Sequence, residues 1–120
     1  MPSKSGAKGA RGERVVAELL TALLHRPVRR ALGAGRQDDV GDLDGLPDTV
    51  IQVADWTNYA RAISTKLPDV EVQMANKDAA YGCLFVKRAR GKWAVVQTPE
   101  QWAALWLAAH QPSLTPDTDT

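Results

Sequence analysis

The chain has 120 residues, of which 44% are hydrophobic and 24% charged, and its formal net charge is +1. This length suits one globular domain and is too short for two, and the charge balance neither requires nor excludes a nucleic-acid partner. No apolar run approaches the roughly 20 residues that span a bilayer, and the first residues lack the apolar core of a signal peptide. Because the single cysteine cannot form an internal disulfide, we expect a cytoplasmic protein without membrane contact.

The first quarter of the chain reads as an arm, a helix and a short strand. Residues 1–8 are small, polar and basic, which predicts a flexible arm. Apolar residues then recur at helical spacing over residues 11–24 and predict an amphipathic helix. Its expected buried stripe consists of Val15, Val16, Leu19, Leu20, Leu23 and Leu24. Pro27 ends this helix, and residues 28–32 favour an edge strand.

Two further strands are predicted over residues 40–43 and 49–54. The loop at 45–48 between them contains Pro and Asp in turn positions and has the length of a hairpin loop, so we expect the strands to pair. The second strand is rich in β-branched residues, which is typical of a central strand. Gly33-Ala34-Gly35, ahead of both, forms a turn that tolerates positive φ.

The second half alternates helices and strands. Thr57 or Asn58 caps a helix over residues 59–66, and Pro68 is expected to end it before another helix begins. Apolar runs then predict strands at 81–88 and 93–97, joined by a tight turn.

The last predicted helix begins at a capping box, with Thr98 as N-cap, Pro99 at the first position and Gln101 three residues after the cap. The tail at 111–120 is expected to be disordered. The order of elements over residues 9–110 predicts one α/β domain with a mixed sheet of four to five strands flanked by helices. Trp102 and Trp106, at helical spacing, are expected in its core.

Oxygen ligands gather at one end of the predicted hairpin. Metal-dependent phosphodiester hydrolysis needs hard oxygen ligands, an activated water and nearby positive charge. Asp42 lies on the first strand and Gln52, with the Val53 carbonyl beside it, on the second. Glu13 on the first helix could add a ligand through water. We therefore expect a Mg²⁺ or Mn²⁺ site at this sheet edge.

These segments resemble a known family. Lys8-Gly9-Ala10-Arg11-Gly12-Glu13-Arg14 is similar to the N-terminal helix motif of the PD-(D/E)xK nucleases of the archaeal Holliday-junction resolvase group, which has phage relatives. Arg29-Arg30 and the glycines at 33–35 resemble the arginine and Gly-rich loop that follow. Gly41-Asp42 matches the PD position, and residues 51–54 align with the (D/E)xK strand. The similarity spans roughly residues 8–97 and implies a restriction-endonuclease-like fold.

The resemblance implies a metal-dependent, structure-specific DNA endonuclease, a Holliday-junction resolvase of phage type. Asp42 would be the main metal ligand and Glu13 an outer ligand, while Gln52 stands where the family has its second carboxylate. Ala54 stands at the position of the family's lysine. Glutamine removes one negative charge and alanine does none of the lysine's work, so the sequence departs from the family at two of the three motif positions.

Other residues could supply the missing carboxylate and the missing lysine. Asp44 shares the strand parity of the main metal ligand, and Asp55 lies just beyond the second strand. Lys77 or Lys87 could supply the lysine, and Gln73 could face the site and the DNA. The alternative for the lysines is an ordinary surface position. Turn formation is the alternative for a set of aspartates, namely Asp38, Asp39, Asp44 and Asp48.

The expected partner is branched or duplex DNA, and the expected state is a homodimer, because symmetric cutting of two strands needs two related sites. Basic residues near the first helix and first strand would contact phosphates by shape rather than sequence; they are Lys8, Arg11, Arg14, Arg29 and Arg30. Two alternatives stay open. Gln52 and Ala54 favour a catalytically inactive nuclease-fold factor of phage that binds DNA or a protein. The near-neutral charge allows a small α/β interaction module without nucleic acid.

Overall fold

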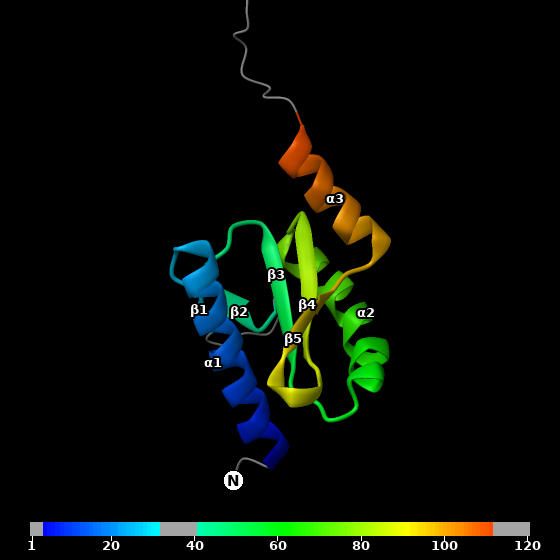
Figure 1. Ribbon diagram of the computed structural model, residues 1–120. Coiled ribbons are helices and arrows are strands. Elements are labelled where there is room, and N and C mark those ends of the chain that lie inside the picture. The colour runs from blue at the N-terminus through cyan, green and yellow to red at the C-terminus, as the bar shows by residue number, and fades with distance from the viewer. Residues whose placement is uncertain (1–3, 32–40, 112–120) are drawn as a thin grey trace, which may run out of the picture.

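The computed structural model describes residues 4–31 and 41–111. Its first helix, α1 (Lys4–Leu24), lies along one face of the sheet (Figure 1). The helix includes residues 4–8, so the predicted flexible arm is corrected there, and residues 1–3 lie outside the described part. The buried stripe is narrower than predicted. Val16, Ala17 and Leu20 are buried, whereas the other predicted members are exposed, namely Val15, Leu19, Leu23 and Leu24.

The central sheet contains β3 (Thr49–Ala54), β4 (Tyr81–Lys87) and β5 (Trp93–Val96) in that spatial order. β3 and β4 are parallel, which requires the helical crossover between them, and β4 and β5 are antiparallel across the short helical turn η1 (Ala89–Gly91). All three strands agree with the predicted ranges to within one residue at each end. The mixed α/β class is therefore confirmed.

A second, two-stranded sheet contains β1 (Arg29–Arg30) and β2 (Leu43–Asp44), which pair antiparallel. The predicted hairpin ladder between β2 and β3 is therefore wrong, and the expected single sheet is divided in two. A backbone hydrogen bond from the Asp42 N–H to the Ile51 carbonyl, at 2.9 Å, joins the residue before β2 to β3. At Gly45 the chain has φ +121° and passes so close to Pro27 that a Cβ would collide with the Pro27 carbonyl oxygen. This close approach holds β2 beside the segment that leads into β1.

Pro68 does not break the chain, because one continuous helix, α2 (Tyr59–Lys77), passes through it. A proline inside a helix costs about 3 kcal/mol. Val70 is fully buried on the sheet and Leu67 packs partly against the same cluster. Since a fully buried side chain of this size contributes about 1.5–3 kcal/mol, packing on both sides of the proline offsets its cost.

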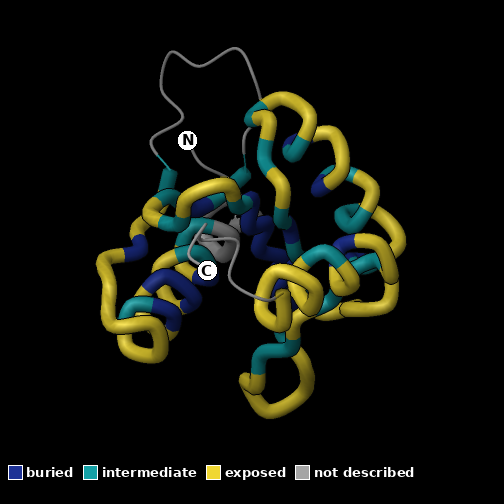
Figure 2. Tube along the Cα trace, turned by 90° about the horizontal axis from the view of Figure 1, so that it is seen from above, coloured by how far each residue is buried: buried dark blue, intermediate teal, exposed yellow. Residues whose placement is uncertain are grey.

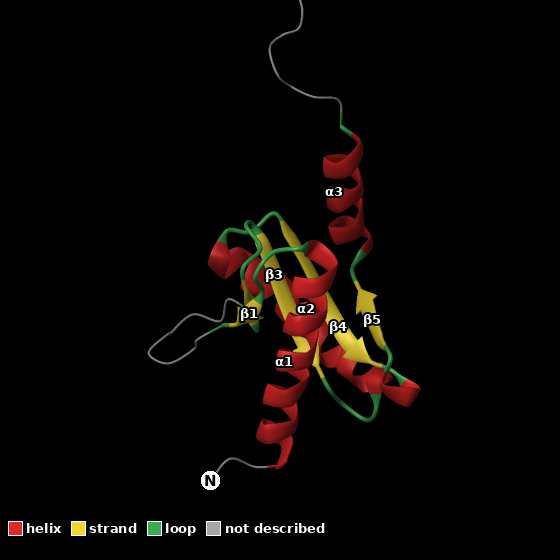
Figure 3. Cartoon of the chain, turned by 60° about the vertical axis from the view of Figure 1, so that its left-hand side comes forward, coloured by secondary structure: helices red, strands yellow, loops and turns green. Residues whose placement is uncertain are grey.

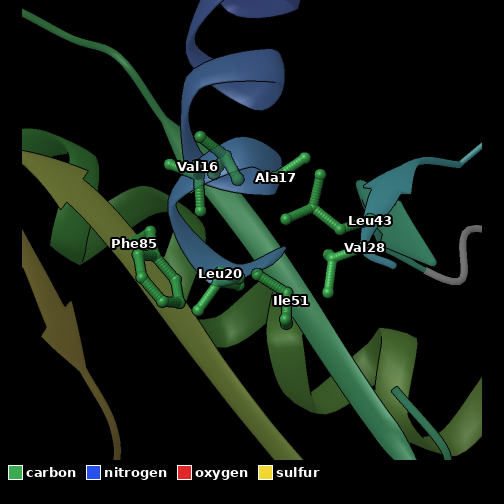
Figure 4. Close-up of a cluster of buried hydrophobic side chains, with 8 residues drawn as sticks. Val16, Ala17, Leu20, Val28, Leu43, Ile51 and Phe85 are labelled. Carbon is green, nitrogen blue, oxygen red and sulfur yellow. The ribbon is translucent and has the colours of Figure 1, made fainter. Parts of the chain in front are cut away.

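The helices α1 and α2 cover opposite faces of the central sheet (Figure 3). Along β3, Ile51 and Val53 join the α1-side core, whereas Val50 and Ala54 join the α2-side core, as the period of two in a strand requires. Figure 4 shows side chains of α1 converging with those of the strands in the first of these cores. Buried segments gather where the helices meet the sheet (Figure 2). The candidate site therefore rests on a strand anchored from both faces.

The last helix, α3 (Pro99–His110), has the predicted capping box: the Thr98 hydroxyl accepts from the Gln101 N–H and the Gln101 side chain accepts from the Thr98 N–H. It extends beyond the end of the sheet (Figure 1). Trp102 and Trp106 are 58% and 47% exposed, so their predicted place in the core is wrong. No helix within residues 4–31 and 41–111 is both long and apolar enough to cross a membrane. Of the predicted disordered tail at 111–120, residues 112–120 lie outside the described residues.

Candidate functional site

A cleft opens at the carboxyl end of β3. Its volume is 540 Å³. We call it the β3-edge cleft, and it is lined by Glu13, Asp42, Gln52, Val53, Asp55, Trp56, Thr57, Asn58, Arg61 and Lys66. Three of the predicted site residues, Glu13 on α1, Asp42 just before β2 and Gln52 on β3, thus meet in one place although up to 39 positions separate them in the chain.

Asp42 is fixed against β3 through its side chain. Its Oδ2 accepts a hydrogen bond from the Val53 N–H at 2.8 Å. The preceding Gly41 makes this approach possible, because it has φ +99° and a Cβ there would lie 3.1 Å from Val50 Cγ1. The Gly41-Asp42 pair therefore has a structural explanation: the glycine permits close backbone contact, and the aspartate then takes the place of a backbone acceptor on the strand edge.

Gln52 is the most unusual residue of the cleft. Its side chain is 6% exposed, and its buried Oε1 has no hydrogen-bond partner in the described part of the chain. Leaving a buried carbonyl oxygen unpaired costs about 1–3 kcal/mol. An oxygen in this state is suited to accept a donor or to coordinate a cation that enters the cleft.

Glu13 reaches the cleft from α1, and its Oε1 accepts a hydrogen bond from Arg30 Nε at 2.9 Å. The two side chains are 20% and 42% exposed, so this pair is worth at most about 1 kcal/mol and can exchange for another partner. Arg30, on β1, is therefore the ion-pair partner of the Glu13 carboxylate. Its predicted role at DNA phosphates competes with this contact.

Asp55 closes the cleft just beyond β3 and is 7% exposed. α1 approaches it closely at Gly12, where a Cβ would lie 2.9 Å from Asp55 Cβ. Lys87, a predicted replacement lysine, pairs with Asp55 Oδ1 at 3.7 Å. Lys87 lines a second groove of 260 Å³ rather than the β3-edge cleft, and the two hollows share Asp55, Trp56 and Thr57.

Two cations from the first turns of α2 line the cleft and were not predicted for it. Arg61 lies three residues after the cap Asn58, whose side chain accepts from the Arg61 N–H at 3.0 Å. Lys66 has its Nζ 5.8 Å from the centre of the Trp56 ring and 3.9 Å from Asp69 Oδ2. Both lie in the first eight residues of α2, which begins five residues after the end of β3, and no motif in the sequence marks either of them.

The remaining predicted site residues lie elsewhere. Lys77 donates from Nζ to the Thr49 carbonyl at 2.8 Å, at the opposite end of β3, so it does not belong to the cleft. Gln73 is buried in α2 and does not line the cleft. Asp44 lies opposite Arg29 in the small sheet, also outside the cleft.

The predicted phosphate contacts on α1 fit an exposed surface. Arg11 and Arg14 are exposed on either side of Glu13, and Arg29 is exposed on β1. The side chain of Lys8 lies outside the described residues, as do Asp38 and Asp39 and the glycines at 33–35. Cys83 packs partly buried against the α1-side core, and burial raises the pKa of its thiol from 9.0 to about 12.

Within residues 4–31 and 41–111, no three His, Cys, Asp or Glu side chains come close enough together to form a metal-binding group. The cleft is lined instead by a fixed carboxylate, a second carboxylate on α1 and a glutamine whose buried amide oxygen has no partner among the described residues. Comparison of the chain with family models, with curated proteins and with solved structures gave no match.

Proposed function

We propose that this protein is a metal-dependent, structure-specific DNA endonuclease of the Holliday-junction resolvase type found in phages. The observation that carries the proposal is the edge of β3, where Asp42, fixed by the Val53 N–H, lines one cleft with Gln52, whose buried Oε1 has no partner among the described residues. The order of Glu13 on α1, Asp42 before β2 and Gln52 on β3 agrees with the order implied by the resemblance. The helix, three strands, helix and parallel strand that run from α1 to β4 support a restriction-endonuclease-like fold.

The cleft fits a small divalent cation. Mg²⁺ keeps several waters and takes only one or two carboxylates from a protein, so a site without three acidic ligands is adequate. Asp42 and Gln52 Oε1 would hold Mg²⁺ or Mn²⁺, and Glu13 would reach it through water. Asp44 drops out of the predicted ligand set because it lies outside the cleft. When bound, such an ion polarises a phosphodiester and lowers the pKa of a water.

Lys66 replaces the missing lysine of the motif. The position that would normally carry it, Ala54, is 1% exposed in the α2-side core and points away from solvent. Lys66 enters the same cleft from α2 and brings a positive charge to the site where negative charge develops on a phosphate. Its contacts with Trp56 and Asp69 are both long, so the ammonium can turn towards a substrate.

Basic residues on both sides of the cleft would bind the DNA backbone. Arg11 and Arg14 are exposed on α1. Residues 79–99 contain no acid and carry four cations at the end of β4 and in the turn that follows it, namely Lys87, Arg88, Arg90 and Lys92. Trp56 lies between this turn and the cleft and lines both hollows. Such a surface holds phosphates without reading bases, as structure-specific recognition requires.

Cleavage of a fluorescently labelled four-way DNA junction in Mg²⁺ or Mn²⁺ tests the proposal. Wild type should cut, and Asp42→Asn should lose at least about 100-fold in rate. Asp44→Asn is the matched control, because this residue lies two positions away but outside the cleft, and it should cut at nearly the wild-type rate. A wild type that cuts with neither metal, or an equal loss in both variants, would overturn the proposal.

Gln52 and Ala54 also favour a second candidate, a catalytically inactive nuclease-fold protein that binds DNA or another protein. In that case the wild type binds the junction tightly without cutting it, and Gln52→Glu does not create metal-dependent cleavage. Gel-shift and cleavage measurements on the same junction separate the two candidates.

A further inference from the structure

A second groove lies beside the β3-edge cleft, at the same end of the sheet. Because β3 and β4 are parallel, the loop after β3 and the turn after β4 come together there (Figure 1). This groove has a volume of 260 Å³ and shares Asp55, Trp56 and Thr57 with the cleft; we call it the β4-turn groove. Since the two hollows have three residues in common, one extended ligand can occupy both.

The β4-turn groove carries an excess of positive charge. Of the described residues that line it, Lys87, Arg88 and Arg90 are cations and Asp55 is the only acid. Asp55 is 7% exposed and its Oδ1 lies 3.7 Å from Lys87 Nζ, whereas both arginines are exposed. An anion that enters the groove therefore meets two arginines, whose planar guanidinium groups match the geometry of a phosphate.

The turn after β4 holds one of these arginines in a backbone conformation that favours glycine. Arg90 has φ +65° and ψ 27°, and the next residue, Gly91, has φ +70°. The Arg88 N–H donates to the Lys92 carbonyl at 2.6 Å and closes the turn. A residue with a Cβ is strained in the left-handed region, and such strain is typical of positions that hold a ligand. The side chain of Arg90 is therefore a candidate for ligand contact.

Trp56 lies at the boundary between the cleft and the groove. It is half-buried, packs partly against the α2-side core and lines both hollows. Lys66 Nζ lies over the ring at 5.8 Å from its centre, near the limit of about 6 Å for a cation–π contact. At this distance the ammonium does not touch the ring centre, so a planar group can take its place. Single-stranded nucleic acid binds to this combination, because its bases stack on an aromatic ring while cations hold its phosphates.

We propose that the β4-turn groove binds an unpaired stretch of one DNA strand and that Trp56 stacks on the base nearest to the β3-edge cleft. This inference rests on the proposed nuclease function for DNA as the ligand, and it names the part of a branched substrate that the groove recognises. Bases beside a branch point lose a stacking neighbour, so they leave the duplex at a lower cost than bases within it. Stacking tolerates every base, so the contact recognises branched structure rather than sequence.

Binding measured in EDTA tests the inference apart from catalysis. Fluorescence anisotropy compares a blunt duplex with the same duplex carrying a short single-stranded tail, with tails of either polarity in separate samples. The wild type should bind one tailed duplex at least about 5-fold more tightly, as stacking of one base predicts. Trp56→Phe keeps an aromatic face and should retain this preference. Trp56→Leu keeps apolar packing without that face and should lose it.

The tryptophan control is Trp102→Leu, because Trp102 is exposed on α3 and lines neither hollow, so this variant should keep the preference. Equal affinity of the wild type for blunt and tailed duplexes would overturn the inference. A preference that survives in Trp56→Leu, or disappears in Trp102→Leu as well, would also overturn it.

Arg90→Gly gives a second readout that a purely structural role would not change. Glycine relieves the strain of the left-handed backbone, so the urea midpoint should not fall. Affinity for the tailed duplex should nevertheless fall at least about 3-fold, and the slope of log affinity against log salt should decrease by about 0.7, the contribution of one phosphate contact to a single strand. Arg26→Ala removes an exposed cation that lines neither hollow and should leave that slope unchanged. An equal decrease in both variants would contradict a role for Arg90.

Cleavage of the four-way junction, measured separately, distinguishes the two proposals. A wild type that shows the Trp56-dependent preference but cuts no junction in Mg²⁺ or Mn²⁺ would refute the nuclease activity and support binding of the unpaired strand. A wild type that cuts the junction and binds blunt and tailed duplexes equally would refute the inference for the β4-turn groove alone.

Discussion

Replacing Gln52 by leucine should stabilise the protein while removing its function. The buried Oε1 of Gln52 has no partner within the described residues, and such an acceptor costs about 1–3 kcal/mol. Leucine has a similar volume and no polar atom. Its imperfect packing at this position should cost less than about 1.5 kcal/mol, which offsets part of the stabilisation. We therefore expect Gln52→Leu to raise the free energy of unfolding by about 1 kcal/mol in the absence of metal.

Urea unfolding followed by tryptophan fluorescence measures this change. Gln101→Leu is the informative control, because Gln101 is equally buried but its amide donates to Glu71 and accepts from Thr98. Losing those two bonds should lower stability by about 1–3 kcal/mol. Mn²⁺ should stabilise the wild type and have no effect on Gln52→Leu. If Gln52→Leu lowered the free energy of unfolding as much as Gln101→Leu does, the interpretation of Gln52 Oε1 as an unpaired ligand atom would be refuted.

Further substitutions test the local geometry. Gly45→Ala should lower the free energy of unfolding by more than about 2 kcal/mol, because φ is +121° and the new Cβ would collide with backbone atoms. Gly91→Ala, at φ +70° with open space around it, should lower it by only about 1 kcal/mol. Equal urea midpoints for the two variants would contradict this difference. The unfolded thiol of Cys83 ionises near 9.0 and the folded one near 12, so between these values only the unfolded chain loses a proton. Stability relative to Cys83→Ala should therefore fall by about 1.4 kcal/mol per pH unit above 9, and a flat difference would argue against burial of the thiol. Lys66→Ala should reduce junction cleavage at least about 100-fold, whereas Lys77→Ala, at the far end of β3, should cut normally; the reverse ranking would place the catalytic cation elsewhere.

Local chemistry explains which elements the sequence predicts well. The β-branched run at 49–54 and the apolar run at 81–88 form the expected strands, and the capping box at Thr98 starts α3 where its residues require. The predicted helix break at Pro68 is wrong because the contacts that stabilise the continuous helix come from strand residues far away in the sequence. The pairing of β2 with β1 misleads for the same reason: the contact of Gly45 with the Pro27 carbonyl is not encoded by either segment alone.

The candidate site divides along similar lines. Asp42 and Glu13 could be predicted because each lies in a short motif that resembles the nuclease family, and both line the β3-edge cleft. Lys66 has no motif around it and reaches the cleft only because α2 begins at the end of β3, so it could not be selected over Lys77 or Lys87 by sequence alone. Strand parity likewise favoured Asp44, but β2 begins only after Asp42, and Asp44 lies opposite Arg29 in the small sheet.

A crystal structure of the protein with Mn²⁺ tests the central claim most directly, because anomalous scattering locates the ion itself. We predict one peak in the β3-edge cleft, within about 2.2 Å of an Asp42 carboxylate oxygen and of Gln52 Oε1. A peak bound only by other side chains, or no peak in this cleft at saturating Mn²⁺, would contradict the account.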